Sequence, residues 1–125
     1  RVVTVEKSPP IADYSYSRSF PTEDTDIQFT DKSSDPDGAI VSWDWDFGDG
    51  HGSDVQNPTH EYSDPGVYTV TLKVLDEDGQ SSTKTIELNV SQVSFQTRTL
   101  TALLLITMIG TIIAYFVLSS RKKRE

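Results

Sequence analysis

The ten-residue stretch 41–50, which reads V-S-W-D-W-D-F-G-D-G, most constrains what this chain can fold into. Its apolar residues alternate with polar ones, the period of two that places one face of a β-strand in a core and the other in water. These apolar residues are Val41, Trp43, Trp45 and Phe47. The closing Gly-Asp-Gly favours a tight turn, because glycine permits positive φ angles. We therefore expect a central strand that carries both tryptophans of the chain into a core.

Similar short runs recur along the first 90 residues, separated by turn signals rich in glycine, proline and aspartate. The loop 48–62 leads to one more short strand. This pattern predicts an all-β fold, an antiparallel β-sandwich with six or seven strands around one core. Besides the central strand, the runs predict strands over 11–17, 26–31, 68–74 and 85–90.

Residues 1–6 also alternate, and they run into Lys-Ser-Pro-Pro at 7–10. Paired prolines remove backbone donors and favour an extended connector. Two interpretations stay open: residues 1–8 are a linker or the end of a preceding domain, or Val2–Val5 form an edge strand of the sandwich. The sandwich itself is expected over 9–91.

The net charge of −8 is unevenly distributed. Residues 1–98 hold 18 acidic and 7 basic residues, a formal charge of −11, whereas residues 121–125 carry +3. A domain this acidic repels phosphate backbones, which excludes nucleic acid as its partner. The absence of cysteine argues against a small scaffold held by disulfides.

Residues 99–120 form a run of 22 residues without charge. As a helix this run is roughly 33 Å long, enough to cross a hydrocarbon core of about 30 Å. We therefore expect a transmembrane helix over 99–120, joined to the sandwich by a polar tether, 92–98. The basic residues of the tail 121–125 predict that this tail is cytoplasmic and the sandwich extracellular, so that the lipid bilayer is a partner.

Small residues gather on one face of the expected helix, without a strict G-x-x-x-G motif. We treat this face as a candidate helix-packing surface. Its members are Thr107, Gly110, Thr111 and Ala114.

Several motifs in the first 90 residues resemble the PKD (polycystic kidney disease) domain, an immunoglobulin-like β-sandwich. The resemblance implies that fold over about 9–91, and a place on bacterial or archaeal cell-surface proteins. There such domains occur in tandem as spacers or binding modules of adhesins, surface-layer proteins and secreted hydrolases. The matching pieces are S-D-P-D-G at 34–38, W-D-F-G-D-G at 45–50, N-P-T-H-E-Y at 57–62, P-G-V-Y-T-V-T-L at 65–72 and D-E-D-G at 76–79.

Four aspartates in two acidic turns are candidate calcium ligands, since both turns are expected at the same end of the sandwich. Ca²⁺ takes six to eight oxygen ligands, and clustered aspartates supply them. The resemblance adds that some PKD domains bind calcium near these loops. Local side-chain to backbone bonds alone would also explain each turn, and the spacing is not that of an EF-hand. The four are Asp35, Asp37, Asp76 and Asp78.

Other marked residues have structural explanations. Trp43, Trp45 and Phe47 are expected in the core, and Tyr68 is expected to anchor its hydroxyl on nearby backbone, as in other sandwiches. Asn89 begins the sequon N-V-S and is a candidate glycosylation site.

Nothing in the sequence indicates catalysis. The two histidines, His51 and His60, lie in polar loops without the spacing of a nucleophile–base pair or of metal ligands. We therefore expect a non-catalytic, single-pass module that makes structural, adhesive or protein–protein contacts in the cell envelope. Two alternatives stay open: the anchoring end of a larger surface hydrolase or surface-layer protein, and an accessory subunit of a membrane complex.

Overall fold

The computed structural model describes residues 1–93 and 95–122, and of residues 95–104 and 122 it describes the backbone alone. The chain divides into two units, Arg1–Gln92 and Val93–Glu125, and each is described by itself.

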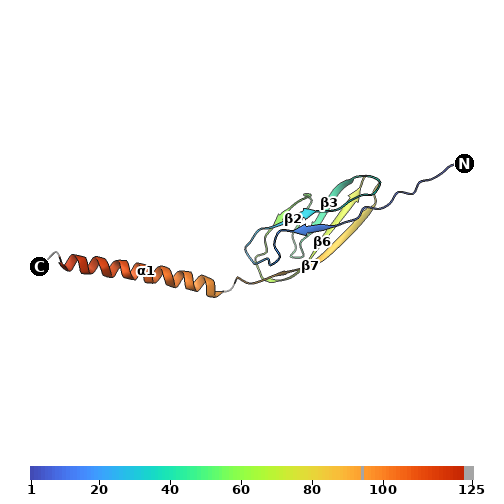
Figure 1. Cartoon of the computed structure of the whole chain (residues 1–125). Helices are drawn as coiled ribbons and strands as arrows, with labels where there is room; N and C mark the ends of the chain where they lie inside the picture. Colours follow the sequence, from blue (N-terminus) through green and yellow to red (C-terminus); the bar gives the residue numbers. More distant parts are fainter. Residues whose placement is uncertain (94, 123–125) are drawn as a thin grey trace. The chain divides into compact units, whose positions relative to one another are not determined.

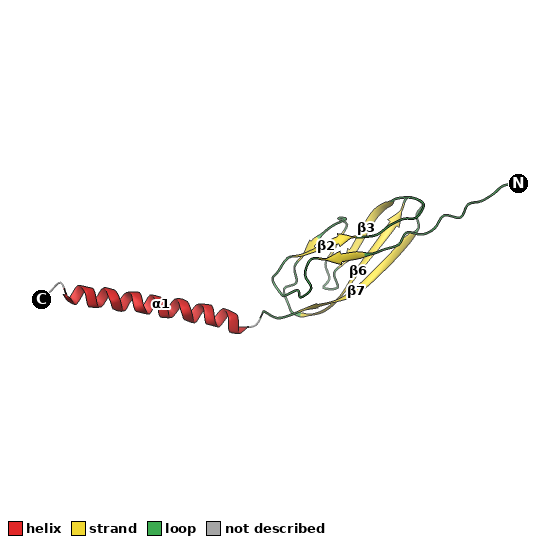
Figure 2. Cartoon of the chain, viewed as in Figure 1, coloured by secondary structure: helices red, strands yellow, loops and turns green. Residues whose placement is uncertain are grey.

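The first unit contains seven β-strands in two sheets (Figures 1 and 2). One sheet has the order β1-β2-β5, and the other has the order β4-β3-β6-β7, with every neighbouring pair antiparallel. This arrangement confirms the expected antiparallel sandwich. The strands are β1 (Tyr14–Tyr16), β2 (Ile27–Asp31), β3 (Ile40–Asp46), β4 (Gly52–Ser53), β5 (Thr59–His60), β6 (Gly66–Asp76) and β7 (Ser81–Val90).

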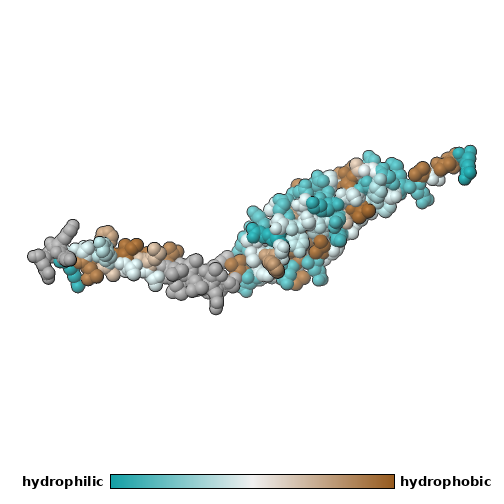
Figure 3. Space-filling view, viewed as in Figure 1, coloured by the Kyte–Doolittle hydropathy of each residue, from teal (hydrophilic) through white to brown (hydrophobic). Residues whose placement is uncertain are grey.

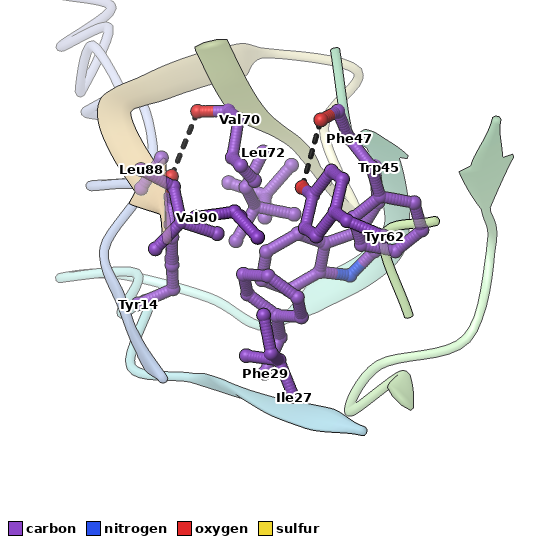
Figure 4. Packing of buried hydrophobic residues seen from close by; sticks show 12 residues of the cluster. Tyr14, Ile27, Phe29, Trp45, Phe47, Tyr62, Val70, Leu72, Leu88 and Val90 are labelled. Atoms are coloured by element: carbon purple, nitrogen blue, oxygen red, sulfur yellow. Dashed lines mark hydrogen bonds between the residues drawn. The ribbon is translucent and has the colours of Figure 1, made fainter. Parts of the chain in front are cut away.

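The core lies between the two sheets and is centred on aromatic rings (Figure 4). Trp45 of β3 packs against Tyr14 of β1 and Phe29 of β2, with ring centroids 5.0 and 5.5 Å apart. Aliphatic side chains of β6 and β7 complete the cluster. The buried apolar residues are Ala12, Tyr14, Ile27, Phe29, Trp45, Phe47, Tyr62, Val70, Leu72, Val74, Leu88 and Val90.

Two buried tyrosines carry hydrogen bonds from one sheet to the other (Figure 4). The Tyr14 hydroxyl donates to the carbonyl of Val70 at 2.7 Å, and the Tyr62 hydroxyl donates to the carbonyl of Phe47 at 2.8 Å. Burial raises the pKa of both phenols, so both hydroxyls keep their protons and remain donors.

A third bond between the sheets joins Trp43 of β3 to Asp31 of β2. The Trp43 indole Nε1 donates to Asp31 Oδ2 at 2.8 Å, and the same oxygen accepts from Gln56 Nε2 at 3.1 Å. Burial acts to raise the pKa of Asp31. The bonds from Ser33, Gln56 and Trp43 outweigh it and hold that pKa below its ordinary value.

The inward set expected for the central strand is wrong at one position. A β-bulge between Ile40 and Ser42 shifts the register against β6, and Val41 is 54% exposed while Ile40 packs on the core. Because the side-chain period of a strand is two, one extra residue turns the side chain to the other face. Beyond the bulge, Trp45 and Phe47 are buried and Trp43 is half-buried, as its bond to Asp31 requires.

The edge-strand interpretation of the first residues is wrong as well. Residues 1–10 contain no strand, and Val2, Val3 and Val5 are exposed. Pro9 and Pro10 lack the N–H groups that a sheet ladder needs, which explains why pairing stops short of them. The first contact with the sandwich ladder is the isolated bridge between Ile11 and Ser34.

The second unit is the helix α1 (Phe95–Lys122), which contains the run expected to span a membrane. Within the described part of the chain, no helix combines the length and the apolar character needed to cross a membrane. The expected transmembrane span is therefore not confirmed. The side chains of its first six residues, 99–104, lie outside the described residues, as do residue 94 of the tether and residues 123–125 of the tail.

The bonds of Asp31 generate a prediction about acid stability. Because its pKa is lowered on folding, the Asp31 carboxylate stabilises the fold fully above its unfolded pKa, near 3.8, and loses that contribution as the pH falls through the folded value. We expect Asp31→Asn to lower the free energy of unfolding by about 1 kcal/mol at pH 7. The difference from the unaltered protein should shrink below about pH 4, measured by urea denaturation with tryptophan fluorescence. A difference that stays constant down to pH 2 would contradict this assignment.

Candidate functional sites at the two ends of the sandwich

Both acidic turns lie at one end of the sandwich, where β3 begins and β6 ends. The backbone N–H of Glu77 donates to the carbonyl of Ala39 at 3.1 Å, which joins the β6–β7 turn to the β2–β3 turn. Ile40 pairs with Asp76 in the same region. The four candidate calcium ligands therefore belong to adjoining turns; we call this region the acidic end.

Two of the four aspartates bind the segment that precedes the sandwich. Lys7 forms an ion pair with Asp78 at 2.9 Å, and the backbone N–H of Ser8 donates to Asp37 Oδ2 at 2.7 Å. These carboxylates hold residues 7 and 8 against the turns.

The other two aspartates shape the turns and keep one oxygen each without a donor. Asp76 is 1% exposed, and its Oδ1 accepts from the backbone N–H groups of Asp78 and Gln80 at 3.0 and 2.7 Å. Asp35 Oδ1 accepts from the Asp37 N–H at 3.3 Å. Among the described residues, the second oxygens of Asp35 and Asp76 and the Oε1 of Gln80 are buried without a hydrogen-bond donor. Three buried acceptors at one end suit a cation better than an anion.

The opposite end of β3 carries the turn 47–51, whose backbone is fixed by side chains. Asp46 Oδ1 accepts from the N–H of Gly48 at 2.8 Å, and Asp49 Oδ1 accepts from the N–H of His51 at 3.1 Å. Gly48 and Gly50 have φ angles of 79° and 89°, in the left-handed region that suits glycine. The chain then enters β4, a short strand that the sequence patterns did not predict.

This turn brings three polar side chains together, a set that we call the aspartate–histidine cluster: Asp49, His51 and His60. His60 Nε2 donates to Asp49 Oδ2 at 2.7 Å, and His51 Nδ1 lies 3.3 Å from Asp49 Oδ1. Burial acts to raise the pKa of Asp49. The bonds from His60 and from the His51 backbone outweigh it and hold that pKa below its ordinary value.

Sequence reasoning missed this cluster. His60 lies nine residues beyond His51, across β4 and the following loop, and belongs to the other sheet. The available signal was T-H-E-Y at 59–62, where His60 and Tyr62 alternate with polar residues, as on the inward face of a strand. Among the described residues, the aspartate–histidine cluster is the single group of three or more metal-ligating side chains whose ligand atoms all lie within 4.8 Å.

The remaining predicted site residues belong to neither cluster. The Tyr68 hydroxyl donates to the carbonyl of Asp64, four residues upstream, at 2.8 Å, and Asn89 is exposed on β7. Thr107, Gly110, Thr111 and Ala114 are exposed along α1, and Thr111 Oγ1 bonds the carbonyl of Met108 at 2.8 Å.

The two-sheet antiparallel arrangement defines an immunoglobulin-like module. The family model described as PKD domain matches residues 7–90, and the chain therefore belongs to the PKD domain family.

Two solved structures are similar to this chain. The PKD1 domain of Vibrio anguillarum Epp is similar, with 32% identity and a TM-score of 0.63 over 70% of this chain and 99% of that structure. A structure from a study of carbohydrate-binding modules of the β-sandwich superfamily has 34% identity and a TM-score of 0.69, over 72% of this chain and 37% of that one.

Curated relatives are much longer than this chain. The pre-pro-metalloprotease PrtV of Vibrio cholerae is 41% identical over 81 residues, which are 65% of this chain and 8% of that protein. The microbial collagenase of Vibrio alginolyticus is 48% identical over 56 residues, 45% of this chain and 7% of that protein. These relatives are bacterial; of the two sources that the resemblance implied, bacterial or archaeal, the archaeal one is not supported.

The two glycines of the turn 47–51 give a matched pair of substitutions. A Cβ on Gly48 would lie 2.6 Å from the carbonyl oxygen of Thr69 in β6, whereas a Cβ on Gly50 meets nothing within 4 Å. Gly50→Ala should cost about 1–2 kcal/mol from the left-handed backbone alone. Gly48→Ala adds the clash with β6 and should cost about 2–5 kcal/mol in all. Urea denaturation measures both costs, and equal costs would contradict the close approach of the turn to β6.

Proposed function

We propose that this chain is a non-catalytic binding and spacing module that makes protein contacts outside the cell. The observation that carries the proposal is the match of residues 7–90 to a family found as accessory modules of secreted proteases. The sandwich also exposes a long polar sheet face and a free sheet edge, whereas its aromatic rings, with the exception of the exposed Phe20, pack in or against the core.

The exposed face of the four-stranded sheet suits protein contacts better than sugar stacking. On β6, Thr69 and Lys73 point away from the core, and on β7 Thr83, Thr85 and Glu87 do so. Sugar rings stack on exposed aromatic faces, but Trp45 is buried and the Trp43 indole binds Asp31. The ten-residue strand β7 lies at the edge of its sheet and offers backbone groups to an added strand.

A binding assay separates protein from carbohydrate partners. The full chain, reconstituted in lipid nanodiscs, is incubated with cell-envelope fractions of its source that have been treated with protease, with glycosidases or with neither. Protein contacts predict that protease treatment abolishes binding and that glycosidase treatment leaves it. Binding that survives protease and is lost with the glycans would contradict the proposal.

We propose further that α1 anchors the module in the cell membrane. Its 22 residues from 99 to 120 carry no charge, and four basic residues follow. Large apolar side chains from Leu105 to Leu118 are exposed along the described part of the helix, where Figure 3 shows brown patches between paler residues. Exposed apolar side chains in such number need a cover of protein or lipid.

Membrane anchoring predicts a simple fractionation result. The full chain in its native membranes should resist extraction by alkaline carbonate, whereas a variant that ends at Gln92 should be released. Added protease should digest the sandwich of intact cells, because the basic residues after the helix predict an extracellular sandwich. Release of the full chain by carbonate would contradict the anchor.

A second candidate function makes this chain the anchoring end of a larger surface hydrolase. The chain spans 8% or less of the curated relatives named above, which are proteases. The mass of the native polypeptide, measured from its source, distinguishes this candidate from a module that acts alone.

We also propose a Ca²⁺ site at the acidic end, formed by Asp35 and Asp76. Each offers a buried carboxylate oxygen that lacks a donor, and Gln80 offers an amide oxygen. These are hard oxygen ligands of the kind that Ca²⁺ prefers. Asp37 and Asp78 have partners in residues 7 and 8, and we therefore assign them the role of completing the site when the preceding segment moves.

Calcium should stabilise the sandwich. For dissociation constants of about 0.1–1 mM, usual for extracellular modules, 10 mM Ca²⁺ adds roughly 1.4–2.7 kcal/mol to the free energy of unfolding. Thermal unfolding measures this gain. Asp76→Asn should abolish it, and Asp54→Asn, which removes an exposed carboxylate elsewhere, should preserve it. An equal gain in both variants would contradict the site.

A further inference from the structure

The aspartate–histidine cluster has the composition of a transition-metal site rather than of a calcium site. It offers two imidazole nitrogens and one carboxylate, and all of the ligand atoms lie within 4.8 Å of one another. Ca²⁺ prefers oxygen ligands alone, whereas Zn²⁺ binds histidine nitrogen and carboxylate oxygen at about 2.0–2.2 Å. Ligand atoms around one ion at such distances lie about 3–4 Å from one another. Small side-chain shifts would therefore bring the three ligand atoms to the spacing that one ion requires.

Two of the three side chains are already held in place. The His60 ring stacks on Phe47 with centroids 4.1 Å apart, and it meets the edge of Tyr62 at 4.7 Å. The His60 and Asp49 side chains are 14% and 17% exposed, and their polar atoms lie 2.7 Å apart. A preorganised pair of ligands lowers the entropy lost when an ion binds.

The third side chain is free to adjust. His51 is 74% exposed, and its Nδ1 already faces the other oxygen of the Asp49 carboxylate at 3.3 Å. Both histidines therefore direct a ring nitrogen at the same carboxylate, one at each of its two oxygens. The outer side of the cluster is open through the exposed His51, so water can fill the remaining coordination positions of an ion.

We propose that Asp49, His51 and His60 bind a divalent transition-metal ion, with Zn²⁺ as the expected species. Asp49 and His51 belong to the turn between β3 and β4, and His60 belongs to β5 of the other sheet. The ion would join the two sheets at the end of the sandwich opposite the acidic end. This inference is independent of the binding function and of the calcium site proposed above.

The test is a titration of the full chain, without a polyhistidine tag and in mild detergent, after removal of metals with a chelator. ZnCl₂ is added in a calorimeter, and CoCl₂ is added in parallel to record visible ligand-field bands. We expect one equivalent of Zn²⁺ to bind, and Co²⁺ to give bands characteristic of nitrogen and oxygen ligands. Binding should also raise the midpoint of thermal unfolding.

One variant and two controls make the result specific. His51→Ala should weaken Zn²⁺ binding about tenfold or more and remove the Co²⁺ bands. Substitution of residues that only hydrogen-bond to metal ligands already lowers metal affinity by about tenfold or more, and His51 is proposed as a ligand itself. Its metal-free midpoint should stay unchanged, because His51 is exposed. Glu61→Gln, next to His60 in sequence, and Asp54→Asn, which removes an exposed carboxylate, should bind Zn²⁺ normally. The proposal is overturned if Zn²⁺ causes no heat and no stabilisation at 1 mM (about tenfold above a weak site's dissociation constant), or if His51→Ala binds as tightly as the unaltered chain.

Discussion

The packing of Trp45 between the two sheets is the contact on which the rest of the sandwich depends. Its indole packs against Tyr14 and Phe29 of the opposite sheet and lies nearly parallel to the ring of Phe47, which follows β3. Fully burying one large aromatic side chain contributes on the order of 2–3 kcal/mol, a substantial part of the stability of a small domain. No disulfide assists, since the chain has no cysteine.

Hydrogen bonds between the two sheets determine how the sheets are aligned across this apolar contact. The tyrosine hydroxyls of Tyr14 and Tyr62 and the indole of Trp43 each reach a partner on the other sheet. His60 and Asp49 form a fourth such bond, at the edge of the core. Because each of these four donors has one specific acceptor, the two sheets are held in one alignment, which in turn positions the turns at both ends.

The side chains that could bind metal ions lie in or beside the turns at the two ends of the sandwich. At the acidic end, Asp35 and Asp76 satisfy backbone donors with one oxygen and keep the other buried. At the opposite end, Asp49 uses both oxygens for histidines. The same residue type therefore has different roles, set by the donors that each turn supplies. This difference is the basis for proposing Ca²⁺, a hard cation, at the acidic end and Zn²⁺, a borderline one, at the aspartate–histidine cluster.

The period-two patterns predicted the sandwich and most of its strands, because inward-facing apolar residues are a local signal. They failed at Val41, where a bulge changes the register, since one inserted residue leaves no trace in a polar–apolar pattern. They also failed at β4 and β5, two-residue strands whose pairing depends on the partner strand. The acidic end was predicted because its turns are rich in aspartate. The aspartate–histidine cluster was not, because its members come from different sheets and meet only in the folded chain.

The central claim is that residues 1–92 form an autonomous domain whose stability comes from the core around Trp45. Urea denaturation of a fragment ending at Gln92, followed by tryptophan fluorescence and far-ultraviolet circular dichroism, tests it most directly. We expect one cooperative transition with coincident midpoints by both probes, equal to the midpoint of the sandwich in the full chain. A fragment that unfolds without cooperativity, or at a clearly lower midpoint than the full chain, would contradict this account of the molecule.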